Sequence, residues 1–329
     1  MFRFNKQYIN KKNTEIYKGI LVICVFLAHL GNYEINYFDN YSFQFLTPLG
    51  YLAVSVFLFL SGYGLSYSVN EKGKFYFNSF IKRRVLPLYI EYILFVVLYT
   101  IYQVIFFKMD ISFEKLFTTL TIGETYVNNG WYVQCIIIIY LFFYVIISSK
   151  IGETHGIVPL AIVGVYTGLY IILQLDFIYV QSIAAFIVGY FYFLLQDTIN
   201  QKLENDRMFL IMAIFWLFLF LTIFGASYVI GNIIIRRILR ILVCAVAPII
   251  FVIGVSHIKF DSKIAKIIGE LSLEMYLLQG MFFSFWGSIC RIEFSLMYAI
   301  LVFGTTFLSA KIVHYGFKKM RNINFGIKR

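Results

Sequence analysis

The sequence is short of charged residues, of proline and of cysteine, and each shortage excludes a class of protein. Only 14% of the 329 residues are charged while 60% are hydrophobic, and the mean hydropathy is +0.80. A soluble domain has about 25% charged and about 45–50% apolar residues, so an ordinary soluble protein is excluded. With only four prolines and 22 glycines, a disordered or collagen-like chain is not expected either.

Cysteine pairs and a signal-peptide cleavage site are also missing. The cysteines are far apart and form no CxxC motif, so neither a disulfide framework nor a metal site is expected; they are Cys24, Cys135, Cys244 and Cys290. The polar, basic N-terminal segment is followed by a long apolar run without a small-residue cleavage site. We therefore expect a retained first helix rather than a removed signal peptide.

Long apolar runs are what the sequence has in abundance. A membrane-spanning helix needs about 20 mostly apolar residues. The runs predict an all-α, polytopic transmembrane bundle of about ten helices, which forms a single membrane domain over residues 1–329 without a soluble appended domain. The ninth span has a polar start, and the fifth and sixth form a tight hairpin. The expected spans are 16–33, 48–69, 86–107, 131–148, 157–175, 177–196, 208–230, 236–256, 269–288 and 294–315.

The positive charges predict an orientation. If the N-terminus is cytoplasmic, 22 of the 28 Lys and Arg residues fall in cytoplasmic segments. The positive-inside rule therefore places both termini in the cytoplasm. The net charge of +11 is then explained by loops that face anionic lipid, and no nucleic-acid partner is expected. Usage rich in Ile, Asn, Lys and Tyr is typical of an AT-rich bacterial genome, so we expect a multi-pass protein of a bacterial cell membrane.

The first span contains a histidine that a purely lipid-facing helix would not need. His29 follows Lys18 by 11 residues, which is about three helical turns and returns to nearly the same face. Glu15 precedes Lys18 by three residues and can lie beside it. Ionisable residues within membrane helices usually face a cavity or a partner. The alternative is that Glu15 and Lys18 anchor the helix at the interface and His29 is an interfacial polar residue.

A basic cluster stands at the cytoplasmic entry to the third span. Lys82, Arg83 and Arg84 precede Pro87 there. Guanidinium groups bind phosphate oxygens bidentately, so the cluster is a candidate phosphate site. The alternative is a cluster that only stops membrane transfer.

Four further groups of polar or aromatic residues can each be interpreted either as part of a binding site or as residues that pack and anchor membrane helices. Ser61-Gly62-Tyr63 allows close approach of a ligand or of another helix. Trp131 and Tyr132 begin the fourth span, where an aromatic belt would also explain them. Residues 268–279 open the ninth span with polar side chains, among them Glu270 and Ser272, and include Tyr276. On the expected outer side, Arg236, Arg237 and Arg240 share a helix face; they either snorkel or bind an acidic or sugar-bearing acceptor.

Together these features resemble the acyltransferase-3 family of membrane acyltransferases. The first span is similar to its signature of an acidic residue, a basic residue and a histidine 11 positions later. Four further motifs follow in the family's order: the Phe-rich Ser-Gly-aromatic segment at 57–63, the Arg-rich segment at 80–89, the Trp motif at 130–140 and Gly-x-x-Ser-x-x-x-Tyr-Leu at 269–277. Two positions depart from the family: Lys18 replaces the usual Arg, and Gln279 stands where the late motif often ends in His.

The resemblance implies transfer of an acyl group, most often acetyl, from a coenzyme A thioester to a sugar hydroxyl of a surface polysaccharide or lipid-linked glycan. His29, with Glu15, would be catalytic, as a general base or as the acyl carrier. Acetyl-CoA is the expected cosubstrate, bound by Lys18, Lys82, Arg83 and Arg84, and no metal is expected. The acceptor pocket would include Ser61, Tyr63, Trp131, Arg236, Arg240, Glu270, Ser272 and Tyr276.

Two other classes of function remain open at this point. A transporter or flippase of lipid-linked sugars would also need many helices and buried polar residues, although such folds often contain internal repeats and none is evident here. A non-catalytic member of a polysaccharide-assembly complex is the third class. The expected partners are the glycan or lipid-linked acceptor, membrane lipids and polysaccharide-assembly proteins.

Overall fold

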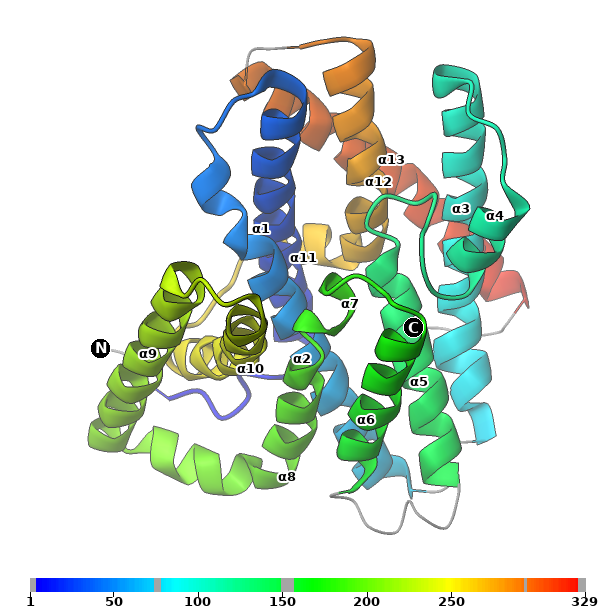
Figure 1. Cartoon of the computed structure of the whole chain (residues 1–329). Coiled ribbons are helices and arrows are strands. Elements are labelled where there is room, and N and C mark those ends of the chain that lie inside the picture. Colours follow the sequence, from blue (N-terminus) through cyan, green and yellow to red (C-terminus); the bar gives the residue numbers. More distant parts are fainter. Residues whose placement is uncertain (1–3, 74–77, 149–156, 293–294, 325–329) are drawn as a thin grey trace. The chain divides into compact units, whose positions relative to one another are not determined.

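A computed structural model describes residues 4–73, 78–148, 157–292 and 295–324 (Figure 1). Within these residues the chain is helical and contains no strand, which confirms the predicted all-α class. Lys150 and the last five residues, which the charge count includes, lie outside the described residues. The helices are α1 Lys11–Phe38, α2 Pro48–Lys72, α3 Leu86–Phe107, α4 Phe113–Leu120, α5 Trp131–Ser148, α6 Ile157–Ile172, α7 Ile178–Gln181, α8 Ala184–Glu204, α9 Asp206–Val229, α10 Ile233–His257, α11 Lys263–Glu270, α12 Ser272–Ser284 and α13 Ser295–Asn324.

Eight helices in the described part of the chain are long and apolar enough to cross a membrane, and they match eight of the expected spans. The fifth expected span corresponds to α6, which is apolar but has only 16 residues. The ninth is divided. The short helix α11 ends at Glu270. Leu271 then leaves helical geometry, with φ −97° and ψ 8°, and α12 begins at the next residue. The polar start of this span is therefore split: Glu270 ends α11, while Ser272 and Glu274 lie in the first turn of α12.

The chain folds into two compact units, each assembled from segments that are distant in sequence. The first unit contains residues 1–21, 51–76 and 146–267, and the second contains residues 22–50, 77–145 and 268–329. Helix α1 contributes its start to the first unit and its end to the second. Of the expected first-span residues, Glu15 and Lys18 therefore belong to the first unit and His29 belongs to the second.

Close backbone contact joins α2 to α8 in the first unit. A Cβ atom on Gly62 would collide with the carbonyl oxygen of Phe186, and one on Gly189 would collide with the carbonyl oxygen of Phe59. Small residues permit such contacts between membrane helices. Of the two possibilities for the Ser-Gly-Tyr segment, approach of a ligand or of another helix, Gly62 thus serves the approach of another helix.

An aromatic cluster holds α12 against α1 and α13 in the second unit. Phe26 and Leu30 of α1 pack with Phe283 of α12 and with Tyr298 and Val302 of α13. The rings of Phe26 and Phe283 stack with centroids 5.1 Å apart, and the Tyr298 hydroxyl donates to the Phe283 carbonyl at 2.9 Å. This packing turns toward α1 the face of α12 that carries Tyr276, Gln279 and Phe283, because residues three and four apart share a helix face.

Candidate active site

His29 lies within the second unit among side chains from three separate parts of the sequence. The ring is half-buried, and its Nδ1 atom lies 3.5 Å from the side-chain nitrogen of Asn129. The side chain of Gln279 also hydrogen-bonds to His29. The ring of Tyr276 lies 6.3 Å away, centroid to centroid. The histidine is therefore held by polar partners and remains partly accessible, as a reacting side chain must be.

Gln279 is placed to fix which nitrogen of His29 carries the proton. Its side chain is buried, and its Nε2 atom donates to the carbonyl oxygen of Tyr276 at 3.1 Å. The amide oxygen is left as the group that can accept an N–H from His29. A neutral imidazole has a single N–H, so this donation leaves the other ring nitrogen with a lone pair. The side-chain nitrogen of Asn129 faces Nδ1, an arrangement in which Nδ1 is the acceptor and keeps its lone pair.

Aromatic side chains form one wall of the site. The rings of Tyr276 and Tyr132 meet edge to face at 5.5 Å, and those of Tyr132 and Trp131 meet in the same way at 6.1 Å. Two residues of the expected pocket, Trp131 and Tyr276, are thus brought into one chain of rings that begins beside His29. Such a wall limits the entry of water and strengthens electrostatic interactions inside the site.

The segment that precedes α5 delivers two asparagines to the site. Asn128 donates to the Tyr33 hydroxyl at 3.1 Å and to the Gly280 carbonyl at 3.3 Å, and so joins this segment to α1 and α12. Asn129 adopts the left-handed conformation, with φ +65°, which asparagine tolerates better than most residues. The turn at Asn129 thereby places its amide opposite His29.

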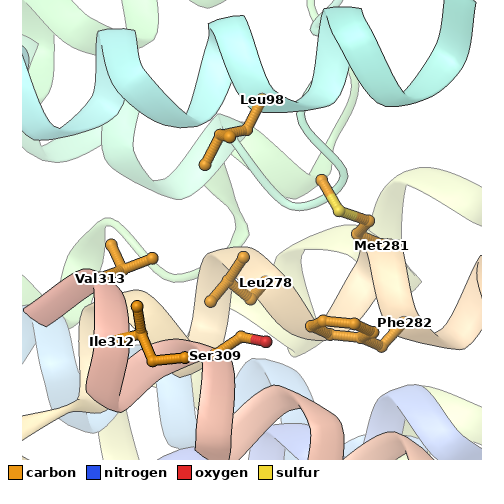
Figure 2. A pocket seen from close by; sticks show the side chains of 7 residues that line it. All are labelled: Leu98, Leu278, Met281, Phe282, Ser309, Ile312 and Val313. Carbon is orange, nitrogen blue, oxygen red and sulfur yellow. The ribbon is translucent and has the colours of Figure 1, made fainter. Parts of the chain in front are cut away.

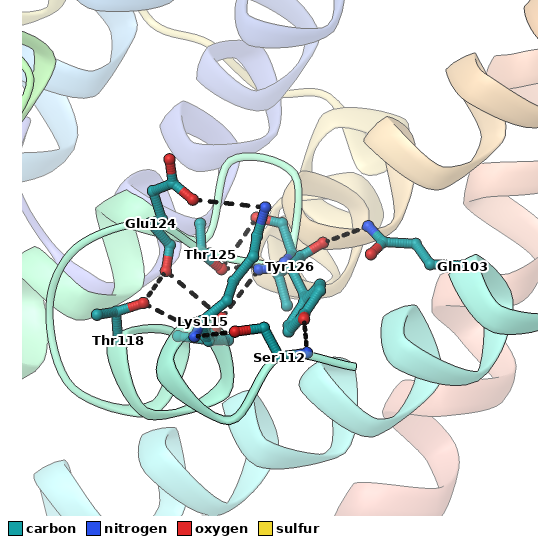
Figure 3. A network of polar contacts seen from close by, with 9 residues as sticks. Gln103, Ser112, Lys115, Thr118, Glu124, Thr125 and Tyr126 are labelled. Atoms are coloured by element: carbon teal, nitrogen blue, oxygen red, sulfur yellow. Dashed lines mark hydrogen bonds and ion pairs between the residues drawn. The ribbon is translucent and has the colours of Figure 1, made fainter. Parts of the chain in front are cut away.

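Polar contacts hold the preceding loop in place (Figure 3). Gln103 of α3 donates to the carbonyl of Tyr126 at 2.9 Å, and the Tyr126 hydroxyl accepts from the backbone of Ser112 at 2.9 Å. Lys115 pairs with Glu124 at 3.6 Å. These bonds hold Glu124 and Tyr126, shortly before Asn128 and Asn129, against α3 and the start of α4.

The contact between Gly280 and Asn128 gives a first prediction. A Cβ atom at residue 280 would lie 2.5 Å from Asn128 Cβ and 3.1 Å from the Tyr99 hydroxyl. We expect Gly280→Ala to lower the free energy of unfolding by about 1–3 kcal/mol and to reduce activity, because it overpacks the site. Gly304 of α13 has open space around it, so Gly304→Ala should leave both unchanged. Thermal unfolding in detergent compares the two variants, and equal melting temperatures would contradict the prediction.

The basic cluster lies in the second unit, at the entry to α3. Lys82, Arg83 and Arg84 occupy a π-helical turn, Ile81–Val85, and are exposed. Within the described residues Lys82 and Arg83 form no ion pair. Phe80, which precedes the turn, is buried against the rings of Phe143 and Tyr144, so the turn has a fixed base. Lys82 and Arg83 are therefore available to an anionic ligand.

The other expected residues are divided between the two units. In the first unit, Ser61 donates to the carbonyl of Phe57 at 3.0 Å and the Tyr63 hydroxyl donates to Gln196 at 2.8 Å. Arg236 and Arg240 lie near the start of α10, also in the first unit. In the second unit, Glu270 is exposed at the end of α11, and Ser272 begins α12 one turn before Tyr276.

Comparison with known protein families gives a match over most of the chain. The acyltransferase domain of the acyltransferase-3 family matches residues 13–314. The chain belongs to this family. No curated protein and no solved structure matches it. The match covers His29, the basic cluster and the segments that carry Asn129 and Gln279, so the chain is a multi-pass membrane acyltransferase.

The acyltransferase contains site residues that sequence reasoning did not assign. Gln279 was noted only as a departure from the family motif, and Asn129 was not singled out. A further pair joins α12 to α13, where Glu274 Oε1 lies 2.6 Å from His314 Nδ1. A buried glutamate in an apolar span was the signal for that pair. Its histidine partner, 40 residues away, could not be chosen from one sequence.

An apolar pocket lies on another face of α12 in the acyltransferase (Figure 2). Its volume is about 290 Å³, and Ser309 supplies the one polar side chain of its lining. No lining residue can take up a proton at neutral pH, so the lining of this pocket offers no general base. The lining residues are Leu98 of α3, Leu278, Met281 and Phe282 of α12, and Ser309, Ile312 and Val313 of α13.

Proposed function

We propose that this acyltransferase moves an acyl group, most often acetyl, from a coenzyme A thioester to a sugar hydroxyl of a cell-surface polysaccharide or a lipid-linked sugar. Its location would be a bacterial cell membrane. The arrangement of His29 carries the proposal, because Gln279 accepts the ring N–H and leaves Nδ1 able to take a proton. A hydroxyl is a poor nucleophile until such a base removes its proton.

The reaction can be written with His29 as general base. Nδ1 takes the hydroxyl proton while the sugar oxygen forms a bond to the thioester carbonyl carbon. The carbon–sulfur bond then breaks, and the coenzyme A thiolate leaves and receives the proton from His29. The amide of Asn129 faces Nδ1 at 3.5 Å, a long contact that an incoming hydroxyl would replace. If His29 instead carried the acyl group, the same nitrogen would attack the thioester first.

The donor is proposed to bind through its phosphates at the basic cluster. Lys82 and Arg83 are exposed, and a guanidinium can grip two phosphate oxygens at once. Lys18, with Glu15 on the preceding turn, is proposed as a further contact for the donor. Lysine offers a point charge rather than a bidentate fork, so this contact is less directional than the arginine of related proteins.

Arg83→Gln tests the donor site. We expect this change to weaken acetyl-CoA binding about tenfold, because it removes a charge-assisted contact to phosphate. Arg207→Gln is the matched control, since Arg207 is an exposed arginine of the first unit. Stabilisation of the purified protein against heat by acetyl-CoA measures both variants. Equal stabilisation of Arg83→Gln and the wild type would refute the site.

The function itself is tested by the acyl esters on surface glycans. Cells that carry the chain should contain esters that disappear when the chain is deleted and return when it is restored. Unchanged ester content after deletion would reject the proposal.

A further inference from the structure

Three arginines lie within the first two turns of α10, in an otherwise apolar helix. We call Arg236, Arg237 and Arg240 the arginine cluster. Asn232 caps the helix start by accepting from the backbone of Ile234 and Ile235, which fixes where the cluster falls. None of the three arginines pairs with a carboxylate among the described residues. A charged side chain within a membrane helix is costly unless a partner compensates its charge. A cluster of arginines without a carboxylate partner therefore favours the binding of an anion.

The contacts of the cluster satisfy only part of its hydrogen-bonding capacity. The Arg240 guanidinium lies 5.9 Å from the Tyr228 ring, and that of Arg237 lies 5.3 Å from the Phe177 ring. Arg236 donates one hydrogen bond, to the Gly231 carbonyl at 3.2 Å. The Nε atoms of Arg236 and Arg240 are buried and have no partner in the described structure. Buried hydrogen-bond donors normally have an acceptor, so these two Nε–H groups are able to donate to a bound ligand.

A second buried donor lies beside the cluster, on α7. Gln181 is 7% exposed, and its Nε2 atom has no partner in the described structure. The same side chain lies beside Cys244, which is one turn after Arg240 on α10. The next residue, Ser182, also contacts the Cys244 sulfur at 3.6 Å. All of these residues belong to the first unit, so unsatisfied guanidinium and amide donors converge at this end of α10.

The surroundings of the cluster indicate that its ligand is borne by a lipid. Ile234 and Ile238 are exposed on the same stretch of α10, and Tyr228 is exposed at the end of α9. In a membrane these apolar surfaces meet lipid chains, and an anion between them must arrive from the lipid side or from the headgroup layer. Arginine forks match phosphate oxygens, whereas lysine offers only a point charge.

We propose that the arginine cluster, with Gln181, binds the phosphate of a lipid-linked sugar that is the acyl acceptor. The proposal rests on the proposed function, since it names the acceptor of that reaction as a phosphate-bearing lipid. The orientation that the charge count predicts puts this end of α10 on the outer side, where an extracytoplasmic glycan precursor would lie. The cluster holds the lipid phosphate and leaves the sugar free for acylation.

The test measures binding to the full-length protein in detergent by native mass spectrometry. The probes are undecaprenyl diphosphate, phosphatidylglycerol and inorganic phosphate. We expect the double change Arg236→Gln with Arg240→Gln to weaken undecaprenyl diphosphate binding at least about tenfold. Arg207→Gln should leave it unchanged, because that exposed arginine lies at the other end of α9. Equal loss in both variants would overturn the proposal, as would no loss in either.

Two further arms separate alternative explanations. If the double change weakens phosphatidylglycerol binding as strongly as that of undecaprenyl diphosphate, the site holds ordinary lipid headgroups and the acceptor assignment is overturned. The double change to lysine keeps the charge without the fork and should recover only part of the binding. Full recovery would overturn phosphate recognition by the guanidinium forks, and this arm remains informative if the glutamine variant misfolds.

Binding is also separable from chemistry. His29→Ala should bind undecaprenyl diphosphate as the wild type does, because His29 is not part of the cluster. Loss of acyl transfer with intact binding in that variant supports the proposal. Cluster-dependent binding in a protein without acyl transfer activity would reject the proposed function and, with it, the acceptor role, while phosphate binding itself would stand.

Discussion

His29→Ala is expected to abolish acyl transfer while the protein still inserts and folds. A positioned general base contributes about 10²–10⁴-fold to a rate, and a covalent carrier is indispensable, so the loss should be at least about 100-fold by either route. The measurement is acetyl ester formed per unit of purified protein from acetyl-CoA and a glycan acceptor. Inserted protein is quantified in the same membranes, so that loss of expression is not mistaken for loss of chemistry.

The control for His29 is His257→Asn. His257 ends α10 in the first unit and stacks on Phe209 with ring centroids 3.8 Å apart, whereas His29 belongs to the second unit. This variant should keep its transfer activity even if its melting temperature falls. Full ester formation by His29→Ala would remove His29 from the mechanism. Loss of glycan itself, with no effect on its acylation, would point to the non-catalytic class of function.

Gln279→Leu is expected to lower kcat about 10–100-fold and to leave the KM for acetyl-CoA unchanged. Orienting partners of a reactive imidazole commonly contribute on that scale. Leucine has a similar volume but cannot accept the ring N–H, so His29 would lose the partner that fixes its proton. Steady-state kinetics in detergent give both constants. A raised KM at unchanged kcat would show that Gln279 contributes to substrate binding instead.

Two variants accompany Gln279→Leu. Met281→Leu introduces the same side chain on the same helix, where residue 281 lines the apolar pocket, and should leave kcat unchanged. Gln279→His restores a hydrogen-bond acceptor of the type common at this position in the family, and it should recover much of the lost rate. Failure of the histidine variant together with a normal melting temperature would contradict a positioning role.

The sequence alone indicated most of the membrane helices because apolar length is a local property. Each of eight long helices could be recognised from its own residues, and helix starts such as Asn232 are local too. The division of the ninth span at Leu271 was harder to foresee, since a polar residue in an apolar run can lie in a helix, at its end or between two helices. In the structure Glu270 ends one helix, and Ser272 and Glu274 begin the next.

The site was only partly accessible from the sequence. His29 was singled out because a histidine in an apolar span needs a reason to be there. Its partners Asn129 and Gln279 lie 100 and 250 residues away, and their contacts depend on how α1, α5 and α12 pack. A glutamine or asparagine has no distinguishing local pattern, so one sequence could not assign these two residues to His29.

Acyl transfer by the purified protein tests the central proposal most directly. The protein is incubated in proteoliposomes with radiolabelled acetyl-CoA and with glycan or lipid-linked sugar from cells that lack the chain. The proposal predicts that each coenzyme A thiol released is matched by one alkali-labile acetyl ester on the acceptor, and that His29→Ala forms neither. Movement of the sugar across the bilayer without ester formation would contradict the proposal and identify a transporter instead.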